Sequence, residues 1–397
     1  MKTVGIICEY NPFHNGHQRQ FRLIRERLGA DTAIVCVMSG DYVQRGAPAL
    51  YPKEVRAEAA IRGGASLVLE LPVTYALRSA EGFAAGGVEI LDGLGVCDFL
   101  SFGCERMGDF LHTAELLDSE ALRKPLHEAL DEGLPFPAAR QKALESVGGD
   151  GALLSMPNTT LAVEYAKALR RRGSRMALLP IPRGGDYHAE TPDPEQPSAS
   201  SLRECGDFLP FVPEETRACY LGQPQYRQEA GERAVLARLR GLTEAEFSEL
   251  PFGSEGLWHK VCRACADCGS TEAIIRAAKS KRYTYTRLSR LILCAYLGIT
   301  EAMLEAPAPY VRALGFDAAG QRLLKQARAQ GSVFLLNAGQ TPPGSDYAAL
   351  ERRCRSLYAL FRTEESGGLC AGSRKERVFS AEKMKKSTCK SKSGVLL

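Results

Sequence analysis

The chain has 397 residues, of which 45% are hydrophobic and 25% charged, and its formal net charge is +4. This length predicts two or three folded units, and the composition is typical of a globular protein rather than a fibrous or low-complexity chain. The sequence contains no apolar stretch long enough to span a bilayer and no signal-peptide pattern, so we expect a cytoplasmic protein without a membrane segment. Thirteen scattered cysteines favour reduced thiols over a disulfide framework.

The first 183 residues alternate between apolar segments typical of buried strands and longer segments with helical spacing. The strand patterns occupy 3–8, 33–40, 66–72, 97–103 and 175–183. The helical patterns between them occupy 15–29, 54–64, 81–95, 109–146 and 158–173, the last with Asn158 as its expected N-cap. This alternation predicts an α/β fold with a Rossmann-like, doubly wound parallel sheet and right-handed crossovers.

Beyond residue 198 the strand patterns almost disappear, and helical patterns such as 234–242 and 287–298 dominate. We therefore expect a sheet domain over 1–210, a mostly helical and partly basic domain over 211–362, and a tail over 363–397. From Ser366 onward the tail carries eight Lys and Arg residues against two acids. We expect this tail to be disordered. Binding of a polyanion and simple solvation are the two alternatives for its positive charges.

The segment "EYNPFHNGH" (9–17) follows the first predicted strand and leads into the first predicted helix. His14 and His17 then lie at a strand-to-helix corner, where open α/β sheets bind ligands and helix N-terminal amides favour an anion. Gly16 lets backbone approach a phosphate, so the pair fits the phosphates of a nucleoside triphosphate and the charge that develops when pyrophosphate leaves. A metal half-site and two unrelated surface histidines are the alternatives. The chain has no P-loop pattern that would serve the same purpose.

A second candidate for phosphate binding is "SASSLRE", which opens a helix just past the last predicted strand. Ser201 and Glu204 fit a capping box at the start of that helix. The hydroxyl groups of Ser198 and Ser200 with the guanidinium of Arg203 would form a compact phosphate clamp. An ordinary helix N-cap is the alternative.

Seven stretches occur in this chain order: "GIICEYNPFHNGH", "VMSGDYVQRGAPA", "LVLELP", "FGCE", "MPNTTLAVEY", "PRGGDYH" and "KSKRYTYTRLSR". Together they resemble the bacterial tRNA(Met) cytidine acetate ligase family of the nucleotidylyltransferase superfamily. The resemblance implies an ATP-dependent ligase that forms acetyl-adenylate from acetate. It further implies transfer of the acetyl group to the wobble cytidine of elongator tRNA(Met), forming N4-acetylcytidine, with ATP used together with Mg²⁺.

The resemblance also implies which residues bind ATP, with His14 and His17 as the catalytic pair. The continuous part of that site comprises Val4, Gly5, Ile6, Ile7, Cys8, Glu9, Tyr10, Asn11, Pro12, Phe13, His14, Asn15, Gly16 and His17. Gly103, Asn158 and Arg183 complete it. Gly103 ends a predicted strand, where a small residue lets the adenosine approach the backbone. Helix capping by Asn158 and a surface ion pair of Arg183 are the alternatives to nucleotide contact.

The stretch "KSKRYTYTRLSR" combines cations with tyrosines and contains no acid. Cations that contact backbone phosphates and aromatic rings that stack on bases are typical of RNA-loop recognition. The predicted tRNA-binding residues are Lys279, Lys281, Arg282, Tyr283, Tyr285 and Arg287. A solvated amphipathic helix is the alternative.

Two other functions compete with the ligase. One is an adenylyltransferase that joins AMP to a phosphorylated small molecule, and the other is a tRNA-binding module without catalysis. The basic, tyrosine-rich stretch argues against the first, because a small substrate needs no such surface. The intact residues of the two phosphate-binding segments argue against the second. The three thiols of Cys262, Cys265 and Cys268 lack a second pair at zinc-ribbon spacing, so we predict no metal there.

Overall fold

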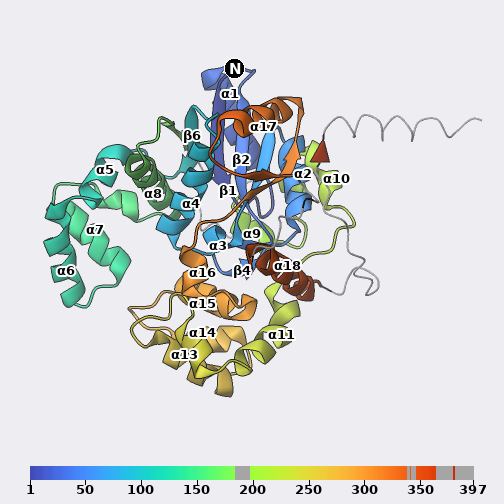
Figure 1. The fold of residues 1–397 in the computed structure, drawn as a ribbon. Helices are drawn as coiled ribbons and strands as arrows, with labels where there is room; N and C mark the ends of the chain where they lie inside the picture. Colours follow the sequence, from blue (N-terminus) through green and yellow to red (C-terminus); the bar gives the residue numbers. More distant parts are fainter. Residues whose placement is uncertain (184–196, 338–339, 341–345, 364–378, 381–397) are drawn as a thin grey trace, which may run out of the picture.

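The computed structural model describes residues 1–183, 197–337, 340, 346–363 and 379–380. In this part of the chain, a central sheet carries helices on both faces, and a helical lobe lies at one end of the sheet (Figure 1). No helix among these residues is long and apolar enough to cross a membrane.

The sheet has the strand order β10-β8-β5-β2-β1-β6-β7, with β9 paired to β8. Its strands are β1 (Thr3–Cys8), β2 (Ala33–Ser39), β5 (Leu67–Leu71), β6 (Phe99–Cys104), β7 (Ala177–Pro182), β8 (Val311–Phe316), β9 (Leu335–Leu336) and β10 (Phe379–Ser380). All neighbours are parallel except β5 and β8, which run antiparallel. The predicted doubly wound sheet is confirmed: from β1 the chain first builds outward through β2 and β5, then returns to build through β6 and β7. The order therefore reverses between β1 and β6, which makes this the switch point of the sheet.

The buried strands divide their side chains between two helical layers, because alternate residues of a strand point to opposite faces. Val4, Ile6 and Cys36 belong to the apolar core under α1 and α2. Ile7 and Val35 belong to the core under α4, α8 and α17. The helices of these layers are α1 (Asn15–Leu28), α2 (Lys53–Arg62), α4 (Ala80–Gly93), α8 (Pro157–Arg172), α10 (Glu214–Tyr220) and α17 (Ala318–Gln330). With both faces covered, the central strands β1 and β2 read as nearly continuous apolar runs.

Two helical units extend from this sandwich (Figure 1). The first is an arm of α5 (Phe110–Leu117), α6 (Arg123–Asp131) and α7 (Phe136–Ser146). The second is the helical lobe, which has its own apolar core around α15. The lobe comprises α11 (Gln228–Arg240), α12 (Glu244–Ser248), α13 (Leu257–Asp267), α14 (Thr271–Ala278), α15 (Tyr285–Leu297) and α16 (Glu301–Glu305), with α18 (Asp346–Tyr358) packed against it. Short elements complete the fold: α3 (Val73–Ala76), α9 (Ala199–Glu204) and a hairpin of β3 (Tyr42–Val43) and β4 (Ala47–Pro48).

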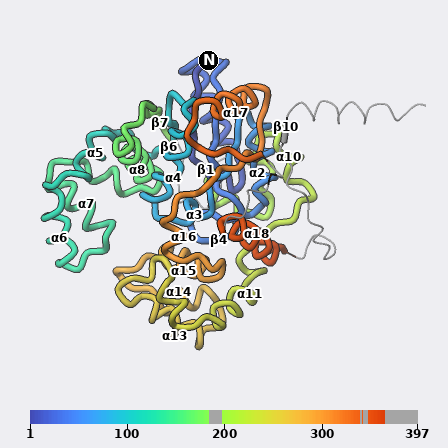
Figure 2. Tube along the Cα trace, viewed as in Figure 1, coloured from blue at the N-terminus to red at the C-terminus, as the bar shows by residue number. Residues whose placement is uncertain are grey.

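The expectation of one helical domain over 211–362 is wrong for residues 311–336. Figure 2 shows the chain leaving the lobe after α16 and rising beside the sheet to α17. There β8 pairs antiparallel with β5, and β9 pairs with β8. The strand was missed because Arg312 interrupts its apolar pattern. The partner that makes Arg312 tolerable in a strand is Glu351, 2.9 Å away and distant in sequence.

The predicted tail lies mostly outside the described residues. Of residues 363–397, the structure describes Thr363 and the two residues of β10, which extend the sheet beside β8.

Candidate functional site

The turn that follows β1, residues 9–17, lies at the switch point of the sheet; we call it the histidine corner. Its rings form a compact stack. His14 is 2% exposed, and its ring centroid lies 3.6 Å from that of His17. The His17 ring also packs on Tyr10, at a centroid distance of 4.7 Å, and on Phe13, at 5.6 Å. These contacts fix the orientation of both imidazoles before any ligand binds.

The backbone of the corner sets which nitrogen of His17 faces a ligand as a donor. The backbone N–H of His14 donates to Nδ1 of His17 at 3.2 Å. Because Nδ1 accepts this bond, the neutral ring of His17 carries its proton on Nε2. Nδ1 of His14 is buried and has no hydrogen-bond partner among the described residues. The corner therefore offers imidazole groups with unused hydrogen-bonding capacity.

Both histidines are neutral at physiological pH. Burial, together with a smaller contribution from the nearby cations Arg183 and Arg203, lowers the pKa of His14 to about 3. Burial also holds the pKa of His17 well below 6.5, with added repulsion from His14 and Arg183. Neutral imidazoles beside fixed guanidinium groups can donate hydrogen bonds to an anion without a charge of their own.

We expect the chain to lose stability below about pH 6.5 because of His14. In the unfolded chain a histidine takes up a proton near pH 6.5, whereas the low pKa of His14 keeps the folded chain unprotonated there. The unfolded state then binds more protons, which lowers the unfolding free energy at about pH 5 by about 2 kcal/mol relative to about pH 8. Urea unfolding of the wild type and of His14→Gln at both pH values measures this contribution. An equal pH dependence in the two proteins would contradict it.

Arg183 lies across the end of β6, next to Gly103. A Cβ atom built on Gly103 would lie 2.9 Å from both Cγ and Cδ of Arg183. Strand β7 ends at Pro182, and the backbone N–H of Arg183 donates to the carbonyl of Cys104 at 2.9 Å. Glycine is thus needed here for a close approach, and the group that approaches is the Arg183 side chain.

The prediction that Asn158 is the N-cap of α8 is wrong. The N-cap is Met156, and Asn158 lies in the first turn. The group that satisfies this helix end is the carboxylate of Glu105, which accepts from the backbone N–H of Asn158 at 3.2 Å and of Thr159 at 2.8 Å. Burial by itself would raise the pKa of Glu105, but hydrogen bonds from Asn158 and Thr159 lower it overall. Glu105 thus orients Asn158 at the ligand edge of the sheet, a role that its place in "FGCE" did not indicate.

The "SASSLRE" segment forms helix α9 and its N-cap, and this helix contacts the histidine corner. Its N-cap is Ser198, whose Oγ accepts from the N–H of Ser201 at 3.1 Å, so the predicted Ser201–Glu204 capping box is wrong. Oγ of Ser200 lies 3.0 Å from Nη2 of Arg203 and 3.1 Å from Nη1 of Arg45.

The other end of the Arg203 guanidinium reaches the corner itself. Its Nη1 donates to the carbonyl of Asn11 at 3.1 Å. Arg203 and Arg45 thus meet at one hydroxyl beside the histidines. Two guanidinium groups that converge on one hydroxyl are suited to binding a phosphate between them.

Arg56 of α2 hydrogen-bonds to the backbone that leads into the histidine corner. The sequence did not indicate this role. Arg56 is fully buried and donates through Nε to the carbonyl of Tyr51 at 2.9 Å and through Nη1 to that of Ser39 at 3.1 Å. It also donates to the carbonyls of Glu9 and Gly40. These bonds join the chain ends that leave β1 and β2. An arginine on the apolar face of a predicted helix is the signal that could have revealed it.

The basic stretch of the lobe is only partly available to a ligand. Lys279, Lys281 and Arg282 are exposed, and Arg282 forms a 2.6 Å ion pair with Glu255. Tyr285 is 45% exposed and donates from its hydroxyl to Glu272 at 2.6 Å.

The other two predicted residues serve the lobe itself. Tyr283 is 5% exposed, so the prediction that it stacks on RNA bases is wrong. It packs instead under the guanidinium of Arg287, which donates to the carbonyl of Phe252 at 2.9 Å and to Oγ of Ser254 at 2.9 Å.

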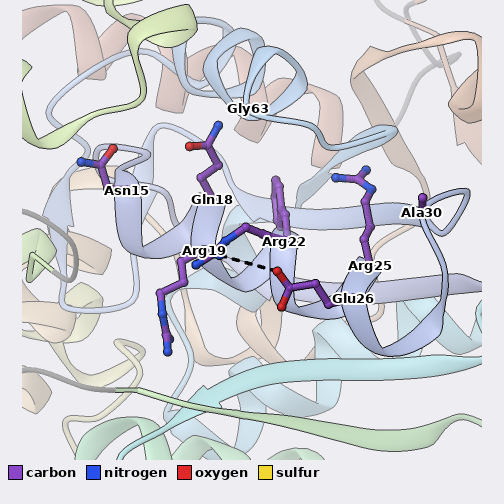
Figure 3. Close-up of a pocket in the computed structure, with 9 residues that line it drawn as sticks. Asn15, Gln18, Arg19, Arg22, Arg25, Glu26, Ala30 and Gly63 are labelled. Atoms are coloured by element: carbon purple, nitrogen blue, oxygen red, sulfur yellow. Dashed lines mark ion pairs between the residues drawn. The ribbon is translucent and has the colours of Figure 1, made fainter.

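A cavity of about 730 Å³ runs along the exposed side of α1 (Figure 3). Its lining comprises Asn15, Gln18, Arg19, Phe21, Arg22, Arg25, Glu26, Ala30 and Gly63. His14, His17 and Arg183 do not line it, and Asn15 is the residue of the histidine corner that does. No group of acids, histidines or cysteines that could hold a metal occurs among the described residues.

The comparisons with known proteins cover the sheet, the histidine corner and the lobe. A family model described as HIGH Nucleotidyl Transferase matches residues 1–368. The tRNA(Met) cytidine acetate ligase of Acetivibrio thermocellus is 34% identical over 365 residues, which cover 85% of this chain and 88% of the relative. That of Clostridium perfringens is 33% identical over 387 residues, which cover 91% and 95%.

Two solved structures of Thermotoga maritima TmcAL are similar to the whole fold. The apo form has a TM-score of 0.85 at 27% identity, and the form bound with alpha-thio ATP has a TM-score of 0.82 at 28% identity. Each comparison covers 96% of this chain and 100% of the other.

Proposed function

Because the chain belongs to the tRNA(Met) cytidine acetate ligase family, we propose that it activates acetate with ATP and acetylates the wobble cytidine of elongator tRNA(Met). The observation that carries this proposal is the pair of neutral, stacked histidines at the start of α1, flanked by Arg183 and Arg203. That arrangement suits the charge that develops on a triphosphate when pyrophosphate leaves.

The reaction proceeds in two steps. An acetate oxygen attacks the α-phosphorus of ATP, an O–P bond forms, and the bond to the bridging oxygen breaks with its electron pair leaving on pyrophosphate. The exocyclic amine of cytidine then attacks the carbonyl carbon of acetyl-adenylate. The C–O bond to AMP breaks, AMP leaves with its electron pair, and the attacking nitrogen loses a proton. Neither step needs a covalent enzyme intermediate, so positioning and charge stabilisation are the main tasks of the protein.

The residues divide these tasks by charge. His17 donates from Nε2 to a phosphate oxygen, and its contribution grows as negative charge accumulates on the leaving pyrophosphate. Arg183 and Arg203 supply the permanent positive charge that attracts the triphosphate. Asn158, oriented by Glu105, lies in the first turn of α8 and contacts the nucleoside.

Mg²⁺ belongs to the substrate in this proposal. The imidazoles of the corner and the neighbouring guanidinium groups of Arg183 and Arg203 are hydrogen-bond donors, which fit phosphate oxygens rather than a hard cation. The ion therefore enters as the counter-ion of the ATP phosphates and neutralises part of their charge, while the side chains of the corner hold the remaining oxygens.

The first experiment is turnover of α-labelled ATP by the purified chain with Mg²⁺ and acetate, with and without elongator tRNA(Met). We expect labelled acetyl-adenylate, and acetate-dependent acetylation of the tRNA when it is present. Labelled AMP joined only to a phosphorylated small molecule would favour the adenylyltransferase instead. Binding of tRNA without any turnover of ATP would favour the tRNA-binding module without catalysis.

We expect the exposed cations of the lobe to act on RNA affinity and not on adenylate formation. The double variant Lys281→Met with Arg282→Met should weaken tRNA binding. The slope of log K against log salt should become shallower by the amount for one to two phosphate contacts. Loss of the exposed Arg282–Glu255 ion pair should change stability little. Equal losses of adenylate formation and RNA binding in a folded double variant would contradict this division of labour.

A further inference from the structure

The β3–β4 hairpin (42–48) lies between the histidine corner and the helical lobe. On the corner side, the backbone N–H of Gln44 donates to Oε1 of Glu9 at 2.7 Å. On the lobe side, Gly46 has φ of +81°, and a Cβ atom there would lie 2.5 Å from the backbone nitrogen of Arg290. The hairpin tip thus rests directly on the backbone of α15, and only glycine permits that approach.

Arg290 projects from this contact, and no acid in the part of the chain that the structure describes forms an ion pair with it. Its Nη1 lies 3.4 Å from the carbonyl of Gln44, and its guanidinium lies 5.0 Å above the ring of Phe252. Its Nε is buried and has no hydrogen-bond partner among the described residues. Burial lowers the pKa of Arg290 to about 10, and the groups acting on it, Cys294 and Arg287, include no carboxylate.

Other buried or half-buried arginines near the corner are satisfied differently. Arg355 binds Asp41 at 2.7 Å and Glu54 at 3.0 Å. Arg56 has four carbonyl acceptors. A half-buried cation with one weak carbonyl contact is costly to keep in the fold. Among the described residues, no carboxylate offsets this cost at Arg290.

Cations continue from Arg290 in both directions. Arg287 lies one turn earlier on α15, beyond which the exposed Lys281 belongs to the same basic stretch. On the other side, Arg45 follows Gln44 in the hairpin and reaches Ser200, the hydroxyl shared with Arg203. This row of positive groups connects the exposed surface of the lobe with the histidine corner.

We propose that Arg290 binds a backbone phosphate of the RNA substrate at the junction between the lobe and the β3–β4 hairpin. The inference rests on the proposed function, since it takes tRNA as the substrate. The ligand chemistry is a phosphate, which the ATP triphosphate also carries. RNA is favoured because Arg290 lies on the lobe, across the hairpin from the histidines, and adjoins the exposed basic stretch. A phosphodiester held there would guide the strand that brings the cytidine to acetyl-adenylate.

The test compares Arg290→Met with the wild type, using the full chain and transcribed elongator tRNA(Met) over a range of KCl concentrations. We expect the slope of log K against log salt to become shallower by about 0.7 to 0.9, the amount for one phosphate contact. Arg290→Lys, which keeps the charge, should restore most of the slope. Arg322→Met, which removes an exposed arginine on α17, is the matched control and should leave the slope unchanged.

A second arm measures acetyl-adenylate formation without RNA, which Arg290→Met should leave within about twofold of the wild type. A raised KM for ATP with an unchanged salt slope would assign the phosphate to ATP and overturn the proposal. An unchanged slope with unchanged ATP kinetics would make Arg290 purely structural and also overturn it. If Arg290→Met does not fold, Arg290→Gln, which retains a donor for the Gln44 carbonyl, takes its place. Failure of the wild type to bind tRNA would contradict the proposed function itself. Failure of the proposed function is thus distinguished from failure of the Arg290 proposal.

Discussion

Replacing His17 with alanine is expected to slow acetyl-adenylate formation by about 10²- to 10³-fold, the usual cost of removing one donor to developing charge. The stacked ring of His14 and the backbone N–H bond to Nδ1 fix His17 with Nε2 as its donor. Its low pKa means that the free enzyme uses the neutral ring over the whole physiological range. The affinity for tRNA should stay within about twofold, because the exposed cations of the lobe lie on other elements.

The measurement is the single-turnover rate of labelled acetyl-adenylate formation, together with tRNA binding by the same preparation. His112→Ala is the matched control, since His112 is exposed on α5 and should change neither property. His17→Asn, which keeps an N–H donor on a shorter side chain, should recover part of the rate. A variant that lost tRNA binding to the same extent as adenylate formation would show that the corner supports the fold rather than the chemistry.

The sheet could be predicted largely because its central parallel strands, β1 and β2, are buried along their whole length. Such strands read as unbroken apolar runs, and the helices between them show a regular apolar spacing. The histidine corner followed from the same reasoning, since the end of β1 and the start of α1 are local features of the sequence. Strand β8 could not be found in this way. Arg312 breaks its pattern, and the acid that compensates it, Glu351, comes from α18 and becomes a neighbour only in the fold.

The candidate site shows the same limit. Asn158 looked like a cap because asparagine before a helical pattern usually is one, but Glu105 from another strand end takes that role. Tyr283 looked like a stacking residue because it lies among cations, yet the packing of the lobe buries it. Residue type and spacing therefore identified the region, whereas the choice between competing roles depended on side chains more than 50 residues away or on burial.

Arg56 carries the largest predicted effect on stability. Replacing it with methionine is expected to lower the unfolding free energy by about 3 to 5 kcal/mol, because four carbonyl groups lose a charged donor. These are the carbonyls of Glu9, Ser39, Gly40 and Tyr51. The measurement is the urea midpoint with its slope, and a lower midpoint at constant slope would report stability alone.

Arg62→Met on the same helix is the matched control. Arg62 binds Glu58 at 2.6 Å near the surface, so its loss should cost less than about 1 kcal/mol. If Arg62→Met lowered the unfolding free energy as much as Arg56→Met, the loss would come from removing an arginine from α2 and not from the four carbonyl contacts.

Arg56→Lys distinguishes stability from positioning at the histidine corner. A lysine ammonium can reach some of the carbonyls but lacks the planar, multi-donor geometry that joins the ends of β1 and β2. The folded lysine variant should therefore keep most of the stability yet form acetyl-adenylate more slowly, with a larger loss in kcat than in ATP affinity. Because the guanidinium contacts backbone rather than substrate, a small displacement of Glu9 would move His14 and His17 together, and misplacement of this kind lowers the rate while binding survives. Unchanged kcat in that variant would mean that the corner holds its geometry through the stacked rings alone.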